Sequence, residues 1–165
     1  MKGTMQNTPI TMIVEIPKGS RNKYEVDHES GNIYLDRMLF TATRYPADYG
    51  YIPDTLAEDG DPLDALALVS EPTFPGCHIR IRPIGLFLME DQGHPDHKVI
   101  GVPLGEPVWA DIQALDDMPP HMLKEIEHFF TVYKDLEEKK TAALGWHNLD
   151  ETLEIIAKSR AAYRG

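Results

Sequence analysis

Short segments in which apolar and polar positions alternate occupy the first two-thirds of the chain and predict β-strands. The segment 11–16 is rich in β-forming residues and stops at Pro17. Residues 23–27 alternate as a half-buried strand does, and the turn residues of 28–32 join them to a second β-prone segment, 33–37. This order of strand, turn and strand predicts a β-hairpin.

Two more strands are expected before the last third of the chain. The long segment 77–89 alternates apolar residues with histidine and arginine, and the apolar segment 98–102 ends at Pro103. The stretch 45–76 lies ahead of them and is punctuated by proline and glycine. It is longer than an ordinary connection, so we expect function there.

The last third of the chain changes to helical spacing. Pro119 and Pro120 open a predicted helix, since proline is tolerated in the first turn. Its apolar positions are Met122, Ile126, Phe129, Phe130 and Tyr133. A second helix is predicted over 150–160, with Asn148 or Asp150 as its N-cap. Together the elements predict an α+β fold, with a mostly antiparallel sheet or small barrel and helices packed outside.

Length and composition indicate one globular domain over residues 1–165, with 42% hydrophobic and 26% charged residues. No apolar run approaches the roughly 18 residues that a membrane span needs. Residues 1–11 lack the pattern of a secretory signal. The single cysteine, Cys77, excludes an internal disulfide, so a cytoplasmic protein is expected.

The charge balance restricts the partners that this chain can bind. Sixteen basic residues stand against 27 acidic ones, a net charge of −11. Such a surface repels nucleic acid and anionic membranes, so neither is an expected partner. A polyanionic substrate needs metal ions or local basic groups at its site. Scattered histidines and one cysteine argue against structural zinc.

The sharpest chemical feature is the acidic loop 59–64, Asp-Gly-Asp-Pro-Leu-Asp, which holds three carboxylates within six residues. Two carboxylates about 4 Å apart repel by about 4 kcal/mol at an effective dielectric of 20. Magnesium, which prefers hard oxygen ligands, would compensate that repulsion. The alternative is a solvated acidic turn, because these residue types are all common in turns. An EF-hand does not fit, since its twelfth position would be Ser70.

Other acidic and basic side chains interleave along the predicted strands and loops. They are Lys23, Glu25, Asp27, Asp36, Arg37, Asp91, Asp96 and Lys98. Each alone fits a solvated face, but together they suggest divalent cations held by carboxylates beside an anion held by lysine and arginine. Phosphoryl transfer uses this combination. The tyrosines at 45–51 and the Tyr133-Lys134 pair read as structural on their own.

Seven motifs in order make the chain resemble the family I soluble inorganic pyrophosphatases, in their bacterial and specifically actinobacterial-like form. The motifs are Glu-Ile-Pro at 15–17, Lys-Tyr-Glu at 23–25, Asp-Arg at 36–37, Tyr-Pro-x-Asp-Tyr-Gly-Tyr at 45–51, the acidic loop at 59–64, Lys-Val-x-x-Val-Pro at 98–103 and His-Phe-Phe-x-x-Tyr-Lys-Asp-Leu-Glu at 128–137. The resemblance spans most of the chain, and the acidic loop is highly specific for this family.

The resemblance implies a fold, a reaction and an assembly. The fold is a five-stranded antiparallel barrel of OB type flanked by two main α-helices. The reaction is hydrolysis of pyrophosphate to two phosphates with several Mg²⁺ ions per active site. The assembly is a homohexamer built from two trimers.

The resemblance also implies a role for each matching residue. Asp61 would be the general base beside the attacking water. The metal ligands would be Asp59, Asp64, Asp91 and Asp96, with Glu15 acting through water. The phosphate ligands would be Lys23, Arg37, Tyr133 and Lys134, with Lys98 close to the leaving phosphate. Glu25 would sit at the rim of the cavity, and Tyr45 and Tyr49 would line the network of metals and water.

One position departs from the family pattern, and other function classes remain as alternatives. Many bacterial relatives carry a second acid after the aspartate that matches Asp91, where this chain has Gln92, so no metal role is assigned there. His28 is expected to be an exposed turn residue. A non-catalytic calcium- or polyanion-binding barrel is one alternative, and a magnesium-dependent nucleotide phosphohydrolase is another. The latter lacks support because no Gly-rich phosphate loop is present.

Overall fold

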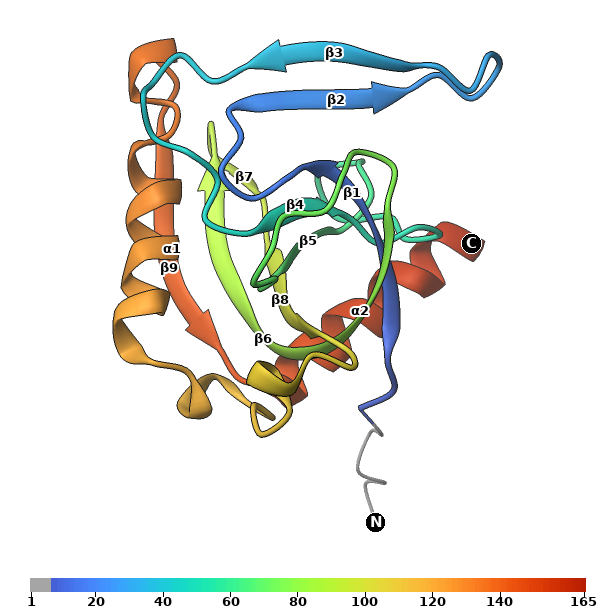
Figure 1. The fold of residues 1–165 in the computed structure, drawn as a ribbon, viewed down its shortest axis with the longest axis vertical. Coiled ribbons are helices and arrows are strands. Elements are labelled where there is room, and N and C mark those ends of the chain that lie inside the picture. Colours follow the sequence, from blue (N-terminus) through green and yellow to red (C-terminus); the bar gives the residue numbers. More distant parts are fainter. Residues whose placement is uncertain (1–6) are drawn as a thin grey trace.

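A closed ring of five strands forms the centre of the molecule, whose computed structural model describes residues 7–165 (Figure 1). Around the ring the strands follow the order β1, β4, β5, β8 and β6, and pairing of β6 with β1 closes it. Their bounds are Ile10–Ile16 for β1, Asp48–Tyr51 for β4, Asp64–Ala67 for β5, His78–Asp91 for β6 and Lys98–Pro103 for β8. The ring confirms the predicted barrel and the α+β class.

Strand direction in the ring differs at one place from a fully antiparallel barrel. β5 and β8 run parallel, with Asp64 opposite Lys98 in the register, whereas the other pairs of the ring are antiparallel. The parallel pair arises because β6 lies between β5 and β8 in the sequence, so the chain crosses over before β8 joins β5. This crossover brings the start of β8 beside the end of the acidic loop.

β6 is longer than the ring requires and continues the sheet beyond it. Its second half pairs with β9 (Thr141–His147), and its last residues pair with the short strand β7 (His94–Pro95). The sequence pattern does not reveal β9, because its middle residues are small or exposed side chains without alternation. β4 and β5 are also hidden, since each contributes only four residues within the proline- and glycine-punctuated stretch.

The predicted hairpin forms a separate two-stranded sheet of β2 (Asn22–Val26) and β3 (Ile33–Met38), which stands above the ring in Figure 1. Lys23 lies opposite Arg37 in its register. The half-buried alternation expected for residues 23–27 is wrong, because exposure in β2 does not alternate: its first three residues are partly buried and its last two are exposed. All six residues of β3 are exposed as well. The hairpin projects from the barrel, so neither face of β3 is covered within the chain.

Two main helices flank the barrel, as predicted. α1 (Pro120–Val132) buries Ile126, Phe129 and Phe130 against the sheet, and α2 (Leu149–Arg164) crosses beneath the ring (Figure 1). The α2 N-cap is Asn148, whose side chain accepts a 3.0 Å hydrogen bond from the backbone N–H of residue 151. Short 3₁₀ turns occupy Pro107–Trp109, Leu115–Asp117 and Asp135–Glu137.

No helix within the described part of the chain is both long and apolar enough to cross a membrane. Residues 1–6, the start of the segment in which no secretory signal is expected, lie outside the described residues.

Candidate active site

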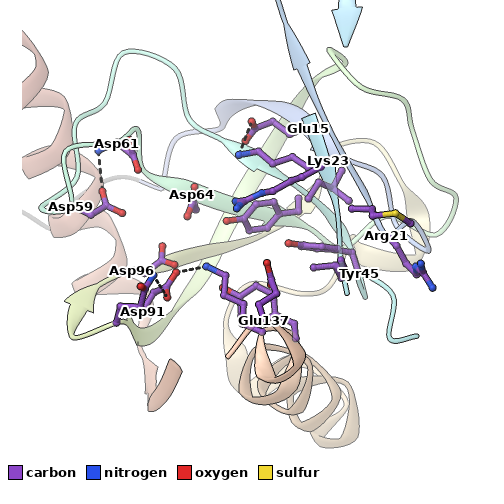
Figure 2. Close-up of a pocket in the computed structure, with 18 of the residues that line it drawn as sticks. Glu15, Arg21, Lys23, Tyr45, Asp59, Asp61, Asp64, Asp91, Asp96 and Glu137 are labelled. Atoms are coloured by element: carbon purple, nitrogen blue, oxygen red, sulfur yellow. Dashed lines mark hydrogen bonds and ion pairs between the residues drawn. The ribbon is translucent and has the colours of Figure 1, made fainter. Parts of the chain in front are cut away.

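One polar cavity of about 360 Å³ lies between the β2–β3 hairpin, the barrel and the end of α1. Its acidic lining residues are Glu15, Asp59, Asp61, Asp64, Asp91, Asp96 and Glu137, and its basic ones are Arg21, Lys23, Arg37 and Lys134. Figure 2 shows the five aspartates on one side of this cavity, with Glu15, Lys23 and Arg21 toward the other. Seven carboxylates and four basic groups thus line a single space, and two of the lysines pair with carboxylates there.

The acidic loop places its carboxylates by its own backbone hydrogen bonds. The N–H of Asp61 donates to Oδ1 of Asp59 at 3.0 Å, and the carbonyl of Asp61 accepts from the N–H of Ala57 at 2.7 Å. Gly60 adopts a φ of 88°, a left-handed conformation that glycine tolerates better than other residues. Asp64 then begins β5, so the third carboxylate is fixed by the barrel itself.

Lys98 holds two of the aspartates together below the cavity. Its Nζ lies 2.7 Å from Oδ2 of Asp64 and 2.8 Å from Oδ1 of Asp96, and it also donates to the hydroxyl of Tyr49 at 2.9 Å. The side chain of Lys98 is 1% exposed. The parallel register of β5 and β8 creates this contact.

Burial and charge shift the pKa values of these groups in opposite directions. Burial raises the pKa of Asp64 to about 7, although Lys98 opposes the shift. Burial also acts to raise the pKa of Asp96, but the Lys98 charge and hydrogen bonds from Asp64 and Lys98 bring it below its usual value. The two carboxyl groups therefore differ in how readily each binds a proton. Burial raises the pKa of Asp59 and of Glu15 as well.

Two further lysines pair with carboxylates on the cavity wall. Lys134, just beyond α1, forms a short ion pair with Asp91 at the end of β6. Lys23 on β2 lies 3.8 Å from Glu15 on β1. Both lysines line the cavity and are partly accessible, so their ammonium groups can reach a bound anion.

Two buried tyrosines and one partly buried tyrosine supply hydroxyl groups to the same space. Tyr45, Tyr49 and Tyr133 line the cavity, and burial raises the pKa of each hydroxyl further above its ordinary value. The hydroxyls therefore stay protonated at neutral pH and can donate hydrogen bonds. Their rings pack with those of Phe129 and Phe130 on α1. This aromatic packing gives the hydroxyls a rigid base.

Most of the predicted site residues meet in this cavity, although their roles stay predictions. Those that line it are Glu15, Lys23, Arg37, Tyr45, Tyr49, Asp59, Asp61, Asp64, Asp91, Asp96, Tyr133 and Lys134. Lys98 lies behind the carboxylates, and Glu25 lines a neighbouring hollow together with His28. Gln92, which adopts a φ of 54°, also lines the cavity next to Asp91.

Sequence reasoning missed two charged lining residues, Arg21 and Glu137. Arg21 lies two positions before Lys23, the spacing at which strand residues share a face, and this signal could have identified it. Glu137 belongs to the 128–137 motif that supports the resemblance, but no role was attached to it. Both side chains enlarge the charged lining beyond the predicted set.

Comparison with known proteins agrees with the geometry of the site. The family model described as inorganic pyrophosphatase matches residues 12–164. An inorganic pyrophosphatase of Methanosarcina acetivorans is 51% identical over 153 residues, covering 93% of this chain and 91% of the relative. One from Leifsonia xyli subsp. xyli is 52% identical over 150 residues, covering 90% and 92%.

The fold agrees with that of solved structures as well. The crystal structure of inorganic pyrophosphatase from Thermus thermophilus has a TM-score of 0.91 and 44% identity, covering 99% of this chain and 95% of that one. The Helicobacter pylori enzyme has a TM-score of 0.92 and 37% identity, covering 100% and 99%. Sequence and structure over nearly the whole chain therefore lead to one conclusion: this chain belongs to the inorganic pyrophosphatase family.

Proposed function

We propose that the chain hydrolyses inorganic pyrophosphate to two phosphate ions in the cavity between the hairpin and the barrel. Pyrophosphate is the substrate of the family, and the reaction adds water across a phosphoanhydride bond. The observation that carries the assignment to this cavity is its lining, which combines seven carboxylates with four basic side chains. The carboxylates suit cations and a water nucleophile, while the basic groups suit phosphate oxygens.

The carboxylate set fits Mg²⁺, which we propose as the cofactor, with several ions per site. Mg²⁺ prefers hard oxygen ligands, and the acidic lining exceeds the basic lining, so the cavity needs added positive charge. Among residues 7–165 no three His, Cys, Asp or Glu side chains form a ready-made cage. The proposed ligands are Asp59, Asp64, Asp91 and Asp96, with Glu15 acting through water. When bound, Mg²⁺ lowers the pKa of a coordinated water and neutralises phosphate charge.

We propose Asp61 as the general base that takes the proton from the attacking water. Asp64 is bound to Lys98, and Asp59 accepts the loop hydrogen bond from the Asp61 N–H. Within the described residues, the Asp61 carboxylate makes no hydrogen bond or ion pair of its own, although it lines the cavity. Its oxygens are therefore available to a water molecule in the cavity.

The substrate phosphates are proposed to bind the basic and tyrosine side chains that line the cavity. Lys23 and Arg37 lie opposite each other in the hairpin register, so both cations come from one two-stranded element. Lys134 and the Tyr133 hydroxyl come from the end of α1. Protonated tyrosine and lysine side chains donate hydrogen bonds to phosphate oxygens, which would stabilise the charge that develops there. Glu25 is a proposed supporting residue at the edge of the cavity, and Tyr45 is a proposed supporting residue in its lining.

A homohexamer in the cytoplasm, built from single-domain subunits, is the proposed form of the protein. The family match over residues 12–164 supports one domain. The exposed apolar side chains of β3, Ile33, Leu35 and Met38, support burial against other subunits, because a two-stranded sheet alone is only marginally stable. The single cysteine fits a reducing compartment.

Phosphate release distinguishes the proposed reaction from the alternatives. Purified protein is assayed with pyrophosphate, ATP and a sugar phosphate, each with Mg²⁺ and with EDTA. We expect release from pyrophosphate only, and only with Mg²⁺. Equal release from ATP would favour a nucleotide phosphohydrolase, and no release from any substrate would favour a non-catalytic ion-binding barrel.

A further inference from the structure

Lys98 occupies an unusual place for a residue expected to bind phosphate. It is the first residue of β8, and its side chain is 1% exposed. The rings of Tyr49 and Phe130 lie 5.1 Å and 5.5 Å from its Nζ, measured to their centroids. The ammonium is therefore enclosed by the barrel and α1 instead of projecting into the cavity.

The hydrogen-bonding capacity of Lys98 is fully used inside the protein. An ammonium group has three N–H donors. Its three acceptors are Oδ2 of Asp64 at 2.7 Å, Oδ1 of Asp96 at 2.8 Å and the hydroxyl of Tyr49 at 2.9 Å. No N–H is left for a phosphate oxygen unless one of these bonds breaks.

The other two lysines of the site differ from Lys98 both in the exposure of their side chains and in the number of N–H donors that are already bonded. Lys134 lines the cavity at 12% side-chain exposure and pairs with Asp91 alone. Lys23 lines the cavity at 24% exposure, and its ion pair with Glu15 is long at 3.8 Å. Each therefore has N–H donors to spare for an anion, whereas Lys98 has none.

The contacts of Lys98 solve an electrostatic problem that the fold creates. β5 and the loop before β8 bring Asp64 and Asp96 to one nitrogen atom, so the two carboxylates are neighbours in a partly buried site. Like charges at that separation repel strongly unless a cation lies between them. Lys98 provides such a cation in the protein without metal.

We propose that Lys98 is a positioning residue, an internal cation that holds Asp64 and Asp96 in place for metal binding, and that it does not contact phosphate directly. The part concerning metal rests on the proposed function. The part concerning the metal-free protein rests on the contacts of Lys98 alone.

The test measures thermal unfolding of the whole protein in EDTA and in Mg²⁺ for Lys98→Met, Asp96→Asn and the double variant. Methionine keeps the length of the lysine stem but removes the charge. We expect Lys98→Met to lower the Tm in EDTA by about 10 °C, because it leaves two partly buried carboxylates without their shared cation. We expect a smaller loss in Mg²⁺, because added cations replace the missing charge.

Rescue separates a charge role from simple packing. In the Lys98→Met background, Asp96→Asn should recover most of the Tm lost in EDTA, whereas in the wild type it should lower the Tm. The matched control is Lys158→Met, which breaks the exposed 3.3 Å ion pair with Glu58 and should leave the Tm in both conditions unchanged. If Lys98→Met cannot be purified, folding of the double variant supports the proposal and its failure to fold overturns it.

Other outcomes overturn the proposal. Equal Tm losses in EDTA and Mg²⁺, with no rescue by Asp96→Asn, would mean that Lys98 only fills space. An unchanged Tm with a raised KM for pyrophosphate would mean direct phosphate contact. The comparison of the single and double variants in EDTA uses neither metal nor substrate. Its result therefore does not depend on whether the proposed Mg²⁺ site is correct.

Discussion

Single residues in the cavity are distinguished by what their polar atoms already bind. Asp64 is committed to a buried lysine, whereas the Asp61 carboxylate has no partner within the described residues and faces the same space. This difference gives two carboxylates three positions apart separate proposed roles, one for metal and one for a proton. The predictions for single residues state how catalysis, substrate binding or metal binding changes when one charged side chain is neutralised.

Replacing Asp61 by asparagine should leave the fold intact and lower kcat at least about 100-fold, because an amide cannot accept the proton of the attacking water. The backbone N–H of residue 61 remains, so the loop hydrogen bond to Asp59 is kept. The measurement is phosphate release under saturating Mg²⁺, with circular dichroism to check folding. Glu58→Gln, an exposed acid beside the same loop, is the control. Near-normal kcat in Asp61→Asn would remove Asp61 from the base role.

Replacing Arg37 by alanine should raise KM for pyrophosphate about tenfold or more and lower kcat, since a charge-assisted hydrogen bond to phosphate is lost. Arg44→Ala is the matched control, because Arg44 bonds only the backbone carbonyl of Gly19 and does not line the cavity. Steady-state kinetics of both variants measure the difference. Unchanged constants for Arg37→Ala would exclude it as a phosphate ligand.

The raised pKa of Asp64 predicts that metal binding is linked to proton release. Because burial raises the pKa of this carboxyl to about 7, most of the population is protonated at pH 6 in the metal-free protein, and little of it at pH 8. Mg²⁺ binds the ionised form, so its affinity should fall as the pH falls through 7. Calorimetry at pH 6 in buffers of different ionisation enthalpy should show much more proton release than at pH 8. Equal proton release at both pH values would contradict this assignment.

For helices and strands, the prediction from sequence succeeded where apolar residues repeat regularly within the segment itself. The hairpin, β6, β8 and both helices follow patterns of two or 3.6 residues and were found within a few positions. β4, β5 and β9 escaped, because four-residue strands and a strand of small exposed side chains carry little pattern. The Lys98 contact with Asp64 was equally hidden, since it joins residues 34 positions apart through a parallel register.

The close pairing of β1 and β4 predicts a strong effect of Gly50→Ala. A Cβ atom at residue 50 would lie 1.8 Å from the backbone carbonyl oxygen of Ile13, which cannot move without breaking the ring. We expect a loss of about 3 kcal/mol or more in unfolding free energy, measured with denaturant. Gly165→Ala at the chain end should change it by less than about 0.5 kcal/mol. A Gly50→Ala variant of normal stability would show that these strands separate more easily than the structure indicates.

In the molecule as a whole, the cavity is built partly from the same elements as the barrel. Its lining comes from the hairpin, from four strands of the ring and from the end of α1. The net charge of −11 would repel a polyanion from the surface, so the basic wall and bound cations must reverse the field locally. The family resemblance could assign residues to this site, but only the folded barrel shows that basic side chains from the hairpin and from the end of α1 line the same cavity as the aspartates.

Because the site and the core share their strands, Mg²⁺ should stabilise the entire chain as one unit. Ligand at 100 times its Kd adds about 2.7 kcal/mol, which corresponds to a rise in Tm of about 5–10 °C for a domain of this size. Far-ultraviolet circular dichroism, which reports the fold, and near-ultraviolet circular dichroism, which reports the packing of aromatic side chains including Tyr45, Tyr49 and Tyr133, should shift together. A near-ultraviolet transition that shifts while the far-ultraviolet transition stays fixed would mean that the site unfolds separately from the barrel, contrary to a single-domain organisation.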